Sequence, residues 1–244
     1  MPRDRRPSAQ RVQLHRALSK LGFGSRGQAW QWIQAGRVRV DGRVVTDPLT
    51  WIELGRQQVA CEGQEAADES ITIALHKPAR VVTTRRDERG RRTIYDLLPP
   101  DLPWLHPAGR LDADSEGLLV LTNDAALSVR LTDPEHHLPK TYQVTIASQP
   151  SEETLRRLRA GIDLADGRTR PARVRRLPTI PDGSVLEMIL TEGKNRQIRR
   201  MLAACGHRVR RLVRVAIGGL PLGDLPPGDH RRLTPRDVKR LLQA

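Results

Sequence analysis

The sequence predicts an α+β chain in two parts, a small basic N-terminal unit and a larger unit built around several strands. Its 244 residues are enough for one large domain or for a large and a small one. Short apolar or alternating runs typical of strands recur along the chain, with helical periodicities between them. An acidic stretch of small residues over 61–70 separates the first group of elements from the rest, and we interpret it as a linker.

The chain begins with a polar, basic segment over 1–10, which we expect to be a disordered arm. The N-terminal unit itself is predicted over 11–60. Apolar residues at helical spacing from Val12 to Leu21 predict its first helix, and the glycines that follow supply the stop.

A second helix is predicted over 26–35, with a serine at its N-cap position. Alternating residues on both sides of Asp41-Gly42 then predict a β-hairpin. A helix N-terminus attracts phosphate, and arginine adds a full positive charge. The unit is therefore predicted to bind the phosphate groups of a nucleic acid. The candidate contact residues are Ser25, Arg26, Arg37, Arg39 and Arg43, the last three expected on one side of the hairpin. An ordinary helical hairpin with surface arginines is the alternative.

The larger unit is predicted over 71–244. Short runs bounded by turn residues predict its strands, and capping residues with apolar periodicity predict its helices. The expected strands are Ile71–His76, Leu118–Leu121, Thr141–Ile146 and Val185–Leu190. The expected helices are Ser151–Ala160, with acids in its first turn, and a segment from Asn195 as N-cap to about Cys205.

The composition indicates a nucleic-acid partner. Lys and Arg number 42 against 28 Asp and Glu, a formal charge of +14, and the sequence pI is near 11.1. The charge is clustered: 12 Lys and Arg face three acids between Arg170 and Arg214. Nearly all these cations are arginine, which suits bidentate phosphate contacts. A basic surface kept for solubility is the alternative.

Several classes of protein are not expected. The two cysteines, Cys61 and Cys205, are too few for a disulfide framework or a zinc site, which favours a reducing, cytoplasmic setting. No stretch approaches the roughly 18 apolar residues of a membrane span, and the first residues lack the apolar core of a signal peptide. We therefore expect no membrane partner.

The candidate catalytic residue lies in the run from Gly109 to Asp124, which reads G-R-L-D-A-D-S-E-G-L-L-V-L-T-N-D. Here Asp112 occupies a turn that leads into a short apolar strand. A carboxylate held on a loop beside a core strand is a candidate catalytic group. An aspartate that merely shapes the turn is one alternative. A metal-dependent nuclease using the acids Asp114, Glu116 and Asp124 is another, although no histidine lies near them at ligand spacing, and we expect no metal.

The helix after Asn195 carries arginines on one face and apolar residues on the other. Arg196 and Arg200 lie opposite the apolar face, whereas Arg199 lies at the border, from which a cation can reach a buried pocket. A solvated basic face is the alternative, and it fits Arg199 less well than its two neighbours.

Three motifs agree in order and spacing with one enzyme family. They are the loop from Gly109 to Asp124, Lys140–Val144 (K-T-Y-Q-V) and Glu192–Met201 (E-G-K-N-R-Q-I-R-R-M). Together they resemble the RsuA/RluB/RluE/RluF group of ribosomal RNA pseudouridine synthases, and the loop is most similar to the RluE branch. The N-terminal unit resembles the alpha-L RNA-binding motif of ribosomal protein S-four, which the RluE branch commonly lacks. Ser115 and Ala125 depart from the commoner residues of the loop motif.

The resemblance implies an alpha-L domain followed by a catalytic domain of mixed, mostly antiparallel sheet with flanking helices. It implies isomerisation of a uridine in ribosomal RNA, 23S rather than 16S, without a cofactor. Asp112 would be the catalytic carboxylate, Arg199 its ionic partner, and Tyr142 the aromatic that packs on the target base.

The resemblance also implies a monomer that acts on ribosomal RNA or on a ribosome assembly intermediate. RNA contacts in the catalytic domain are expected from Arg110, Lys140, Lys194, Asn195, Arg196 and Arg200. A non-catalytic assembly factor that keeps the fold for binding is the remaining alternative.

Overall fold

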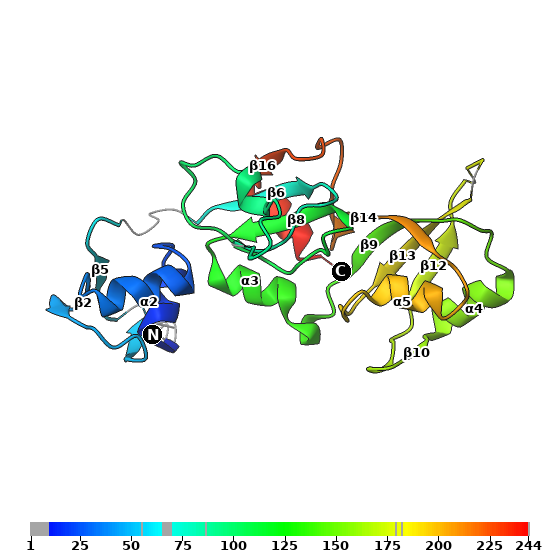
Figure 1. Ribbon diagram of the computed structural model, residues 1–244. Coiled ribbons are helices and arrows are strands. Elements are labelled where there is room, and N and C mark those ends of the chain that lie inside the picture. The colour runs from blue at the N-terminus through cyan, green and yellow to red at the C-terminus, as the bar shows by residue number, and fades with distance from the viewer. Residues whose placement is uncertain are drawn as a thin grey trace, which may run out of the picture. The chain divides into compact units, whose positions relative to one another are not determined.

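The computed structural model describes residues 10–54, 56–64, 70–85, 87–178, 180–181 and 183–243. Apart from Gln10, the expected arm lies outside these ranges, as does the middle of the expected linker. The chain divides into two compact units, one mainly of residues 1–71 and one mainly of residues 72–244 (Figure 1). The predicted α+β class is confirmed, and the two units are taken in turn.

The described residues of the first unit form two helices and two small antiparallel sheets. One sheet pairs β1 with β4, and the other has the order β3-β2-β5. The elements are β1 (Gln10–Gln13), α1 (Leu14–Lys20), α2 (Arg26–Gln34), β2 (Val38–Val40), β3 (Arg43–Val44), β4 (Trp51–Leu54) and β5 (Val59–Cys61). Buried apolar residues from both helices and from the strands form a core of their own.

Local signals predicted the second helix and the hairpin correctly. The Ser25 hydroxyl accepts from the Gln28 amide at 3.2 Å, and the Gln28 side chain accepts from the Ser25 amide at 3.1 Å, which makes a capping box for α2. The hairpin turns at Asp41-Gly42, both with positive φ.

Two details of this unit differ from the prediction. Val12 lies in β1 and not in the first helix, because it pairs with Ile52 and the helix begins only at Leu14. The hairpin arginines do not share one side: Arg39 is opposite Val44, whereas Arg43 is opposite Val40 on the other side of the ribbon.

The second unit is built on a sheet of nine strands among its described residues, and the main path of this sheet runs β12-β13-β9-β14-β8-β6-β16. Its strands are β6 (Thr72–Lys77), β7 (His106–Pro107), β8 (Glu116–Thr122), β9 (Lys140–Ile146), β12 (Arg173–Arg176), β13 (Ser184–Leu190), β14 (Val209–Ile217), β15 (Leu220–Pro221) and β16 (His230–Arg232), with a separate hairpin of β10 (Asp163–Leu164) and β11 (Gly167–Arg168). Its helices are α3 (Ala125–Thr132), α4 (Glu152–Ala160), α5 (Gln197–Ala203) and α6 (Pro235–Leu241), with short 3-10 turns at Ile94–Leu97 and Pro134–His136. All four predicted strands and both predicted helices are present within a few residues of their expected bounds.

The predicted mixed, mostly antiparallel sheet is confirmed, since β8 and β14 form a short parallel pair in an otherwise antiparallel path. Arg214 lies beside Gly117 in this pair. Gly117 has φ +109°, and a Cβ there would lie 2.2 Å from the Arg214 carbonyl oxygen. The glycine of the G-L-L motif is therefore what lets the two central strands approach each other.

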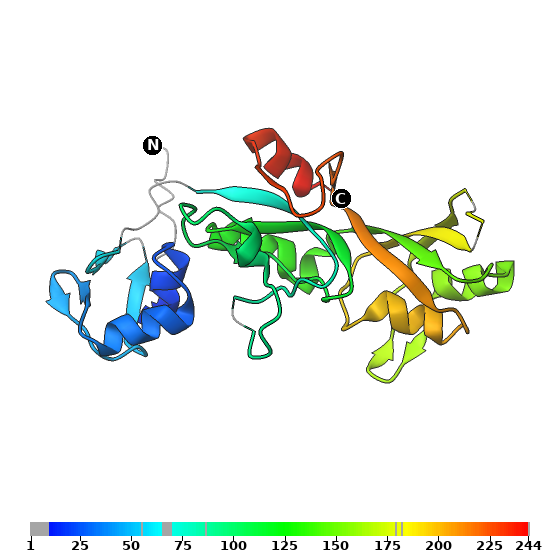
Figure 2. The same ribbon diagram turned by 45° about the horizontal axis from the view of Figure 1, so that its top comes forward.

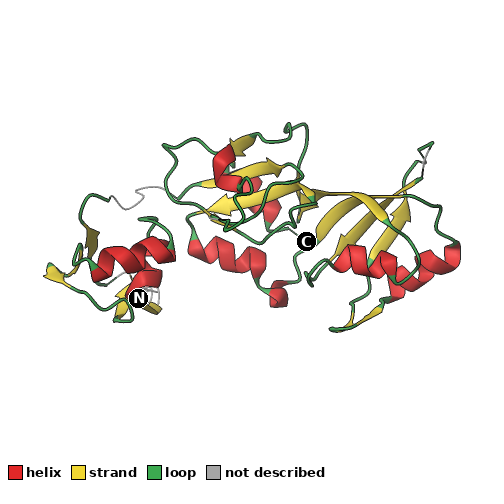
Figure 3. Ribbon diagram, in the orientation of Figure 1, coloured by secondary structure: helices red, strands yellow, loops and turns green. Residues whose placement is uncertain are grey.

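The helices cover the sheet over two separate apolar clusters (Figure 3). At one end, α4 and α5 pack on β9 and β13, with Met188 and Met201 fully buried between them. At the other end, α3 and α6 contribute Leu127 and Leu241 to the cluster that contains β6 and β8 residues. Figure 2 shows α6, in red, beside the cyan strand β6. Residues of both clusters line one cavity together with the polar residues Lys140 and Tyr142 of β9 and Arg214 of β14.

Among the described residues, no helix has the length and apolar character needed to cross a membrane.

Candidate active site

The predicted catalytic carboxylate, Asp112, lies on a loop whose backbone is held by several hydrogen bonds. The Thr83 hydroxyl donates to the Leu111 carbonyl at 2.8 Å and accepts from the Leu111 amide at 3.3 Å. On the other side of Asp112, the Ala113 carbonyl accepts from the Arg80 amide at 2.7 Å. These contacts fix the direction in which the Asp112 side chain leaves the loop.

A buried lysine supports the same loop. Lys77 is fully buried, and its Nζ donates to the carbonyls of Pro78 and Val81 at 2.8 and 2.7 Å and lies 3.5 Å from the Ala113 carbonyl. Burial lowers the pKa of Lys77 to about 8, while the carboxylates of the loop and of β8 act in the opposite direction. The lysine thus places a basic group beneath the acidic loop.

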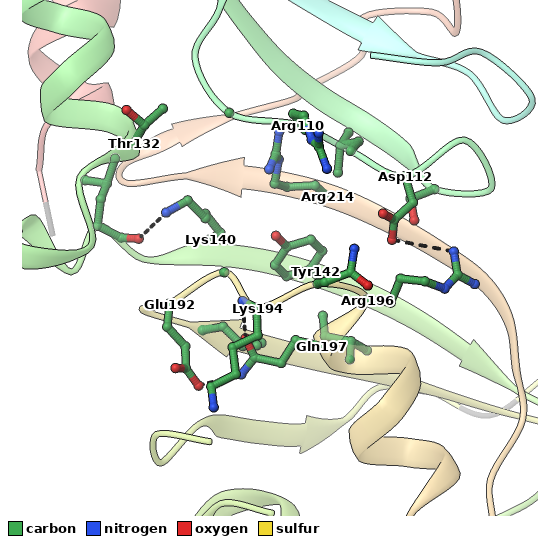
Figure 4. A pocket seen from close by; sticks show the side chains of 18 of the residues that line it. Arg110, Asp112, Thr132, Lys140, Tyr142, Glu192, Lys194, Arg196, Gln197 and Arg214 are labelled. Atoms are coloured by element: carbon green, nitrogen blue, oxygen red, sulfur yellow. Dashed lines mark hydrogen bonds and ion pairs between the residues drawn. The ribbon is translucent and has the colours of Figure 1, made fainter. Parts of the chain in front are cut away.

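A cavity of about 310 Å³ lies beside Asp112, over the middle of the sheet. Its apolar walls come from both clusters, for example Leu131 from one and Ile198 from the other. Figure 4 shows the polar side chains that surround it. Among those labelled are Arg110, Asp112, Lys140, Tyr142, Glu192, Lys194, Arg196 and Arg214, and Asn195 also lines the cavity. The structure therefore brings together seven of the residues predicted for the catalytic domain, namely Arg110, Asp112, Lys140, Tyr142, Lys194, Asn195 and Arg196.

The Asp112 carboxylate lines this cavity, and an arginine lies within ion-pair distance of it. Its side chain is 30% exposed, and Arg196 Nη1 lies 3.7 Å from Asp112 Oδ2 (Figure 4). A guanidinium at this distance stabilises the negative charge of a half-buried carboxylate.

Tyr142 and Lys140 enter the cavity from the same face of β9, because they are two residues apart on a strand. Tyr142 is half-buried and packs against the cluster under α5, so its ring has a fixed position. Lys140 Nζ donates to the Leu138 carbonyl at 3.2 Å. Burial, and to a smaller extent the charge of Arg214, lower the pKa of Lys140 to about 8.

Arg214 is a buried cation of the cavity that the sequence prediction missed. It is 3% exposed, lies opposite Tyr142 in the β9–β14 pairing, and its Nε donates to the Leu118 carbonyl at 2.7 Å. Its Nη2 is buried without a hydrogen-bond partner in the described structure. A signal was present: an arginine within the apolar run from Leu212 to Ile217 is expected to be buried and functional.

In the structure Arg199 pairs with Asp114, whereas the sequence predicted a pairing with Asp112. Arg199 Nε lies 3.3 Å from Asp114 Oδ2, and its Nη2 donates to the Asp114 carbonyl at 2.8 Å. It is Arg196 that reaches Asp112, because Arg196 is itself the N-cap of α5, with φ 47°, and Asn195 is not. The left-handed backbone at Arg196 directs its side chain toward the loop, one position before the regular helix that carries Arg199.

Two other predicted RNA-binding residues are held by the β10–β11 hairpin. Lys194 Nζ donates to the carbonyls of Asp166 and Gly167 at 3.0 and 2.8 Å. Arg200 Nη2 donates to both carboxylate oxygens of Asp166 at 2.9 Å, and Arg200 does not line the cavity. These contacts fix the segment before α5 and leave Arg200 on the far side of the helix.

The predicted contact residues of the first unit do not line the cavity. Ser25 is engaged as a helix cap, whereas Arg26 is exposed. Arg37 Nη2 donates to the Glu62 carbonyl at 2.7 Å, and Arg39 Nη1 donates to the Gly42 carbonyl at 3.1 Å.

The acids next to Asp112 are engaged by arginines. Asp114 accepts from Arg196 at 2.8 and 3.0 Å, and Glu116 accepts from Arg211 at 2.9 and 3.0 Å. These hydrogen bonds lower the pKa of both carboxyls. In the part of the chain that the structure describes, no group of three or more acidic, histidine or cysteine residues could hold a metal ion.

Comparison with known proteins matches both units to families. Residues 71–204 match the family described as RNA pseudouridylate synthase, and residues 13–49 match the S4 domain. The chain is 37% identical to ribosomal large subunit pseudouridine synthase B of Bacillus subtilis (strain 168), covering 93% of this chain and 94% of that protein. It is 48% identical to ribosomal large subunit pseudouridine synthase E of Xanthomonas axonopodis pv. citri (strain 306), covering 64% of this chain and 90% of that protein.

A solved structure supports the same fold. The crystal structure of a pseudouridylate synthase superposes with a TM-score of 0.69 at 31% sequence identity, covering 94% of this chain and 99% of the other.

Proposed function

Because this chain belongs to the RNA pseudouridylate synthase family, whose members isomerise uridine in RNA, we propose that Asp112 catalyses this isomerisation at one uridine of large-subunit ribosomal RNA. The observation that carries the proposal is the half-buried Asp112 carboxylate facing Tyr142 and two arginines across a cavity of about 310 Å³.

In this reaction the N1–C1′ bond of the uridine breaks and a C5–C1′ bond forms. The uracil rotates between the two steps, the C5 proton is released, and N1 gains a proton, so the reaction needs no cofactor. Asp112 acts either by adding to the base or by assisting its departure from C1′. Tyr142 packs on the uracil ring and helps to remove the C5 proton.

The cations of the cavity keep Asp112 ionised and favour negative charge on the detached uracil. Arg196 lies 3.7 Å from the carboxylate, and Arg214 is a buried guanidinium with a free donor. Positive charge that is fixed before the reaction stabilises a developing anion without reorganisation. We assign this role to Arg214 and Arg196 in place of Arg199.

The target nucleotide must leave its stack to enter the cavity, at a cost of a few kcal/mol. Arg110, next to Asp112 and exposed, is placed to support or replace the displaced base. Lys140, Lys194 and Asn195 are assigned to the backbone around the target. The first unit, through Arg26, Arg37 and Arg39, is assigned to RNA further away.

The large ribosomal subunit is proposed as the target because two relatives similar to this chain are named for it. Sequencing of pseudouridines in both ribosomal RNAs from a strain that lacks the gene tests this. One uridine of 23S RNA should lose its modification. A loss confined to 16S RNA would contradict the assignment.

The catalytic proposal is tested by release of tritium from ribosomal RNA labelled at uridine C5, with EDTA present. The wild-type protein should release tritium and Asp112→Asn should release none, while both bind RNA with similar affinity. RNA binding without release by the wild type on folded RNA and on assembly particles would instead indicate an assembly factor. RNA cleavage that EDTA abolishes would indicate a nuclease.

A further inference from the structure

One tryptophan of the first unit presents its ring to solvent. Trp51, on β4, is 57% exposed, which is the largest value among the exposed large apolar side chains of the described residues. It does not belong to the core of the unit. Trp30, by contrast, is 37% exposed and packs edge-on against His15, with the ring centroids 5.3 Å apart. The indole ring of Trp51 therefore offers a large apolar area that a ligand could cover.

The register of β1 and β4 places this ring on the outer face of a two-stranded ribbon. Val12 pairs with Ile52, and both side chains are buried in the core of the unit. Side chains alternate along a strand, so Gln13, directly opposite Trp51, shares the other face with it, and so does Arg11. The exposed ring is thus surrounded by polar side chains on its own face.

A guanidinium group lies over the Trp51 ring. The Cζ atom of Arg11 is 6.0 Å from the ring centroid, at the outer limit of a cation–π contact. Flat groups in direct contact lie about 3.5 to 4.0 Å apart, so the guanidinium and the indole do not touch. A flat ring between them would need about 7 Å, or two contact distances. Arg11 is exposed, and a small outward movement of its side chain provides that space.

The surroundings of Trp51 favour a nucleotide as the occupant. Between Arg11 and Leu54 the chain has seven Lys and Arg against three acids, a balance of +4. Glu53, the acid on the outer face, pairs with Arg56 at 3.0 Å. A single ring among polar side chains is small for a protein interface, whose centre is usually a continuous apolar area. A nucleotide combines a flat base with polar edges and a negative phosphate.

We infer that Trp51 stacks on an unpaired base of the RNA substrate, with the Arg11 guanidinium on the other face of that base. The inference rests on the RNA-binding role proposed for the first unit, and it adds a contact that does not depend on phosphate. Both residues lie outside the stretch 13–49 that matches the S4 domain. Every base has a π face, so this contact selects an unpaired nucleotide and not a particular base.

The test compares Trp51→Ala and Trp51→Phe, in the full chain, for affinity to the shortest ribosomal RNA fragment that the wild type binds. Trp51→Ala should weaken binding about five- to 100-fold, the range for loss of one stacked base. The slope of log affinity against log KCl should stay that of wild type, because no phosphate contact is lost. Trp51→Phe keeps an aromatic ring and should recover most of the affinity. The rate of tritium release at saturating RNA should not change, because no residue of the first unit lines the cavity beside Asp112 (the first cavity).

Leu49→Ala is the matched control, since Leu49 is 48% exposed in the same unit but has no ring. Its affinity should equal that of wild type. A second measurement replaces single unpaired nucleotides of the fragment by abasic ones. One such position should weaken binding to the wild type by about the same factor as Trp51→Ala. The RNA with that position abasic should bind Trp51→Ala as well as the intact RNA does.

Three results would overturn the inference. Unchanged affinity of Trp51→Ala would mean that RNA does not cover the ring, and a protein partner would become the occupant to seek. A loss that Trp51→Phe does not recover, or that no abasic position reproduces, would mean that no base stacks there. Failure of the proposed function is recognised separately, as absence of tritium release by a wild-type protein whose RNA binding still depends on Trp51.

Discussion

Arg214 is a guanidinium buried in a central strand, beside Tyr142 and with one donor unsatisfied. Arg214→Gln keeps a side-chain donor that can reach the Leu118 carbonyl but removes one buried positive charge from the first cavity. We expect the single-turnover rate to fall by about 10² to 10³, because one fixed electrostatic group of the active site is lost. RNA affinity should change by less than about threefold. Tritium release and filter binding on the same RNA measure the two effects.

Arg211→Gln is the control for this prediction. Arg211 lies on the same strand but is exposed and pairs with Glu116, so its loss should leave the saturating rate near wild type. If Arg214→Gln instead weakens RNA binding and keeps the rate, Arg214 is a backbone contact and not part of the chemistry.

The RNA contact proposed for Lys140 predicts that binding is sensitive to pH. Its pKa in the free protein is lowered to about 8, whereas a bound phosphate raises it again. About half of Lys140 is therefore protonated at pH 8 and nearly all of it by about pH 6 to 7, so above pH 8 RNA binding must be coupled to uptake of a proton. We expect affinity to fall by about fivefold between pH 8 and pH 9, as the protonated fraction of Lys140 falls.

Arginine at this position stays charged, so Lys140→Arg should bind RNA with little change over the same interval. Equal pH dependence in wild type and variant would assign the titration to another group. Lys77, whose pKa is also about 8, is fully buried beneath the loop and does not line the cavity.

At the scale of elements, the close approach of β8 and β14 depends on one glycine. In Gly117→Ala the new methyl carbon would lie 2.2 Å from the Arg214 carbonyl oxygen, on a residue with φ +109°. Backbone atoms must shift, so we expect a loss of unfolding free energy of several kcal/mol, from overpacking and strain together. Urea denaturation measures it.

Gly27→Ala in α2 is the matched control, because nothing lies within 4 Å of its added Cβ and the residue is helical. That change should stabilise the protein by about 0.5 to 1 kcal/mol. A small effect of Gly117→Ala would mean that the parallel pair tolerates wider spacing.

Elements with local signals could be predicted from the sequence, and those defined by distant partners could not. The Ser25 cap and the Asp41-Gly42 turn each follow from hydrogen bonds within a few residues. Strand β14 was not predicted as a strand, because its arginines interrupt the apolar alternation and the segment was assigned only to a basic region. The partners of Arg211 and Arg214 are Glu116 and the Leu118 carbonyl, which lie more than 90 residues away in the sequence. The same limit applies to the contact that Arg199 makes with Asp114, since helical spacing does not show that α5 begins after a left-handed Arg196.

For the whole molecule, the division into two units confines the first cavity to the second unit. The first unit has its own core, and every residue lining the first cavity comes from the second unit. The match to ribosomal large subunit pseudouridine synthase E covers 64% of this chain and 90% of that protein. The formal charge of +14 gives the whole protein a salt-sensitive attraction for RNA, to which both units contribute.

The proposed RNA contacts of the first unit, which lie outside the first cavity, predict how charge variants in that unit behave. The double variant Arg26→Gln with Arg39→Gln removes two exposed cations, so affinity for target RNA should fall about tenfold or more at 100 mM KCl, with a slope against log KCl lower by about 1.4 to 1.8. The tritium-release rate at saturating RNA should remain that of wild type, because the first cavity is unchanged. Arg56→Gln, which is 73% exposed and pairs with Glu53 in the same unit, should alter neither quantity. A drop in the saturating rate of the double variant would show that the first unit shapes the active complex and does more than hold the RNA.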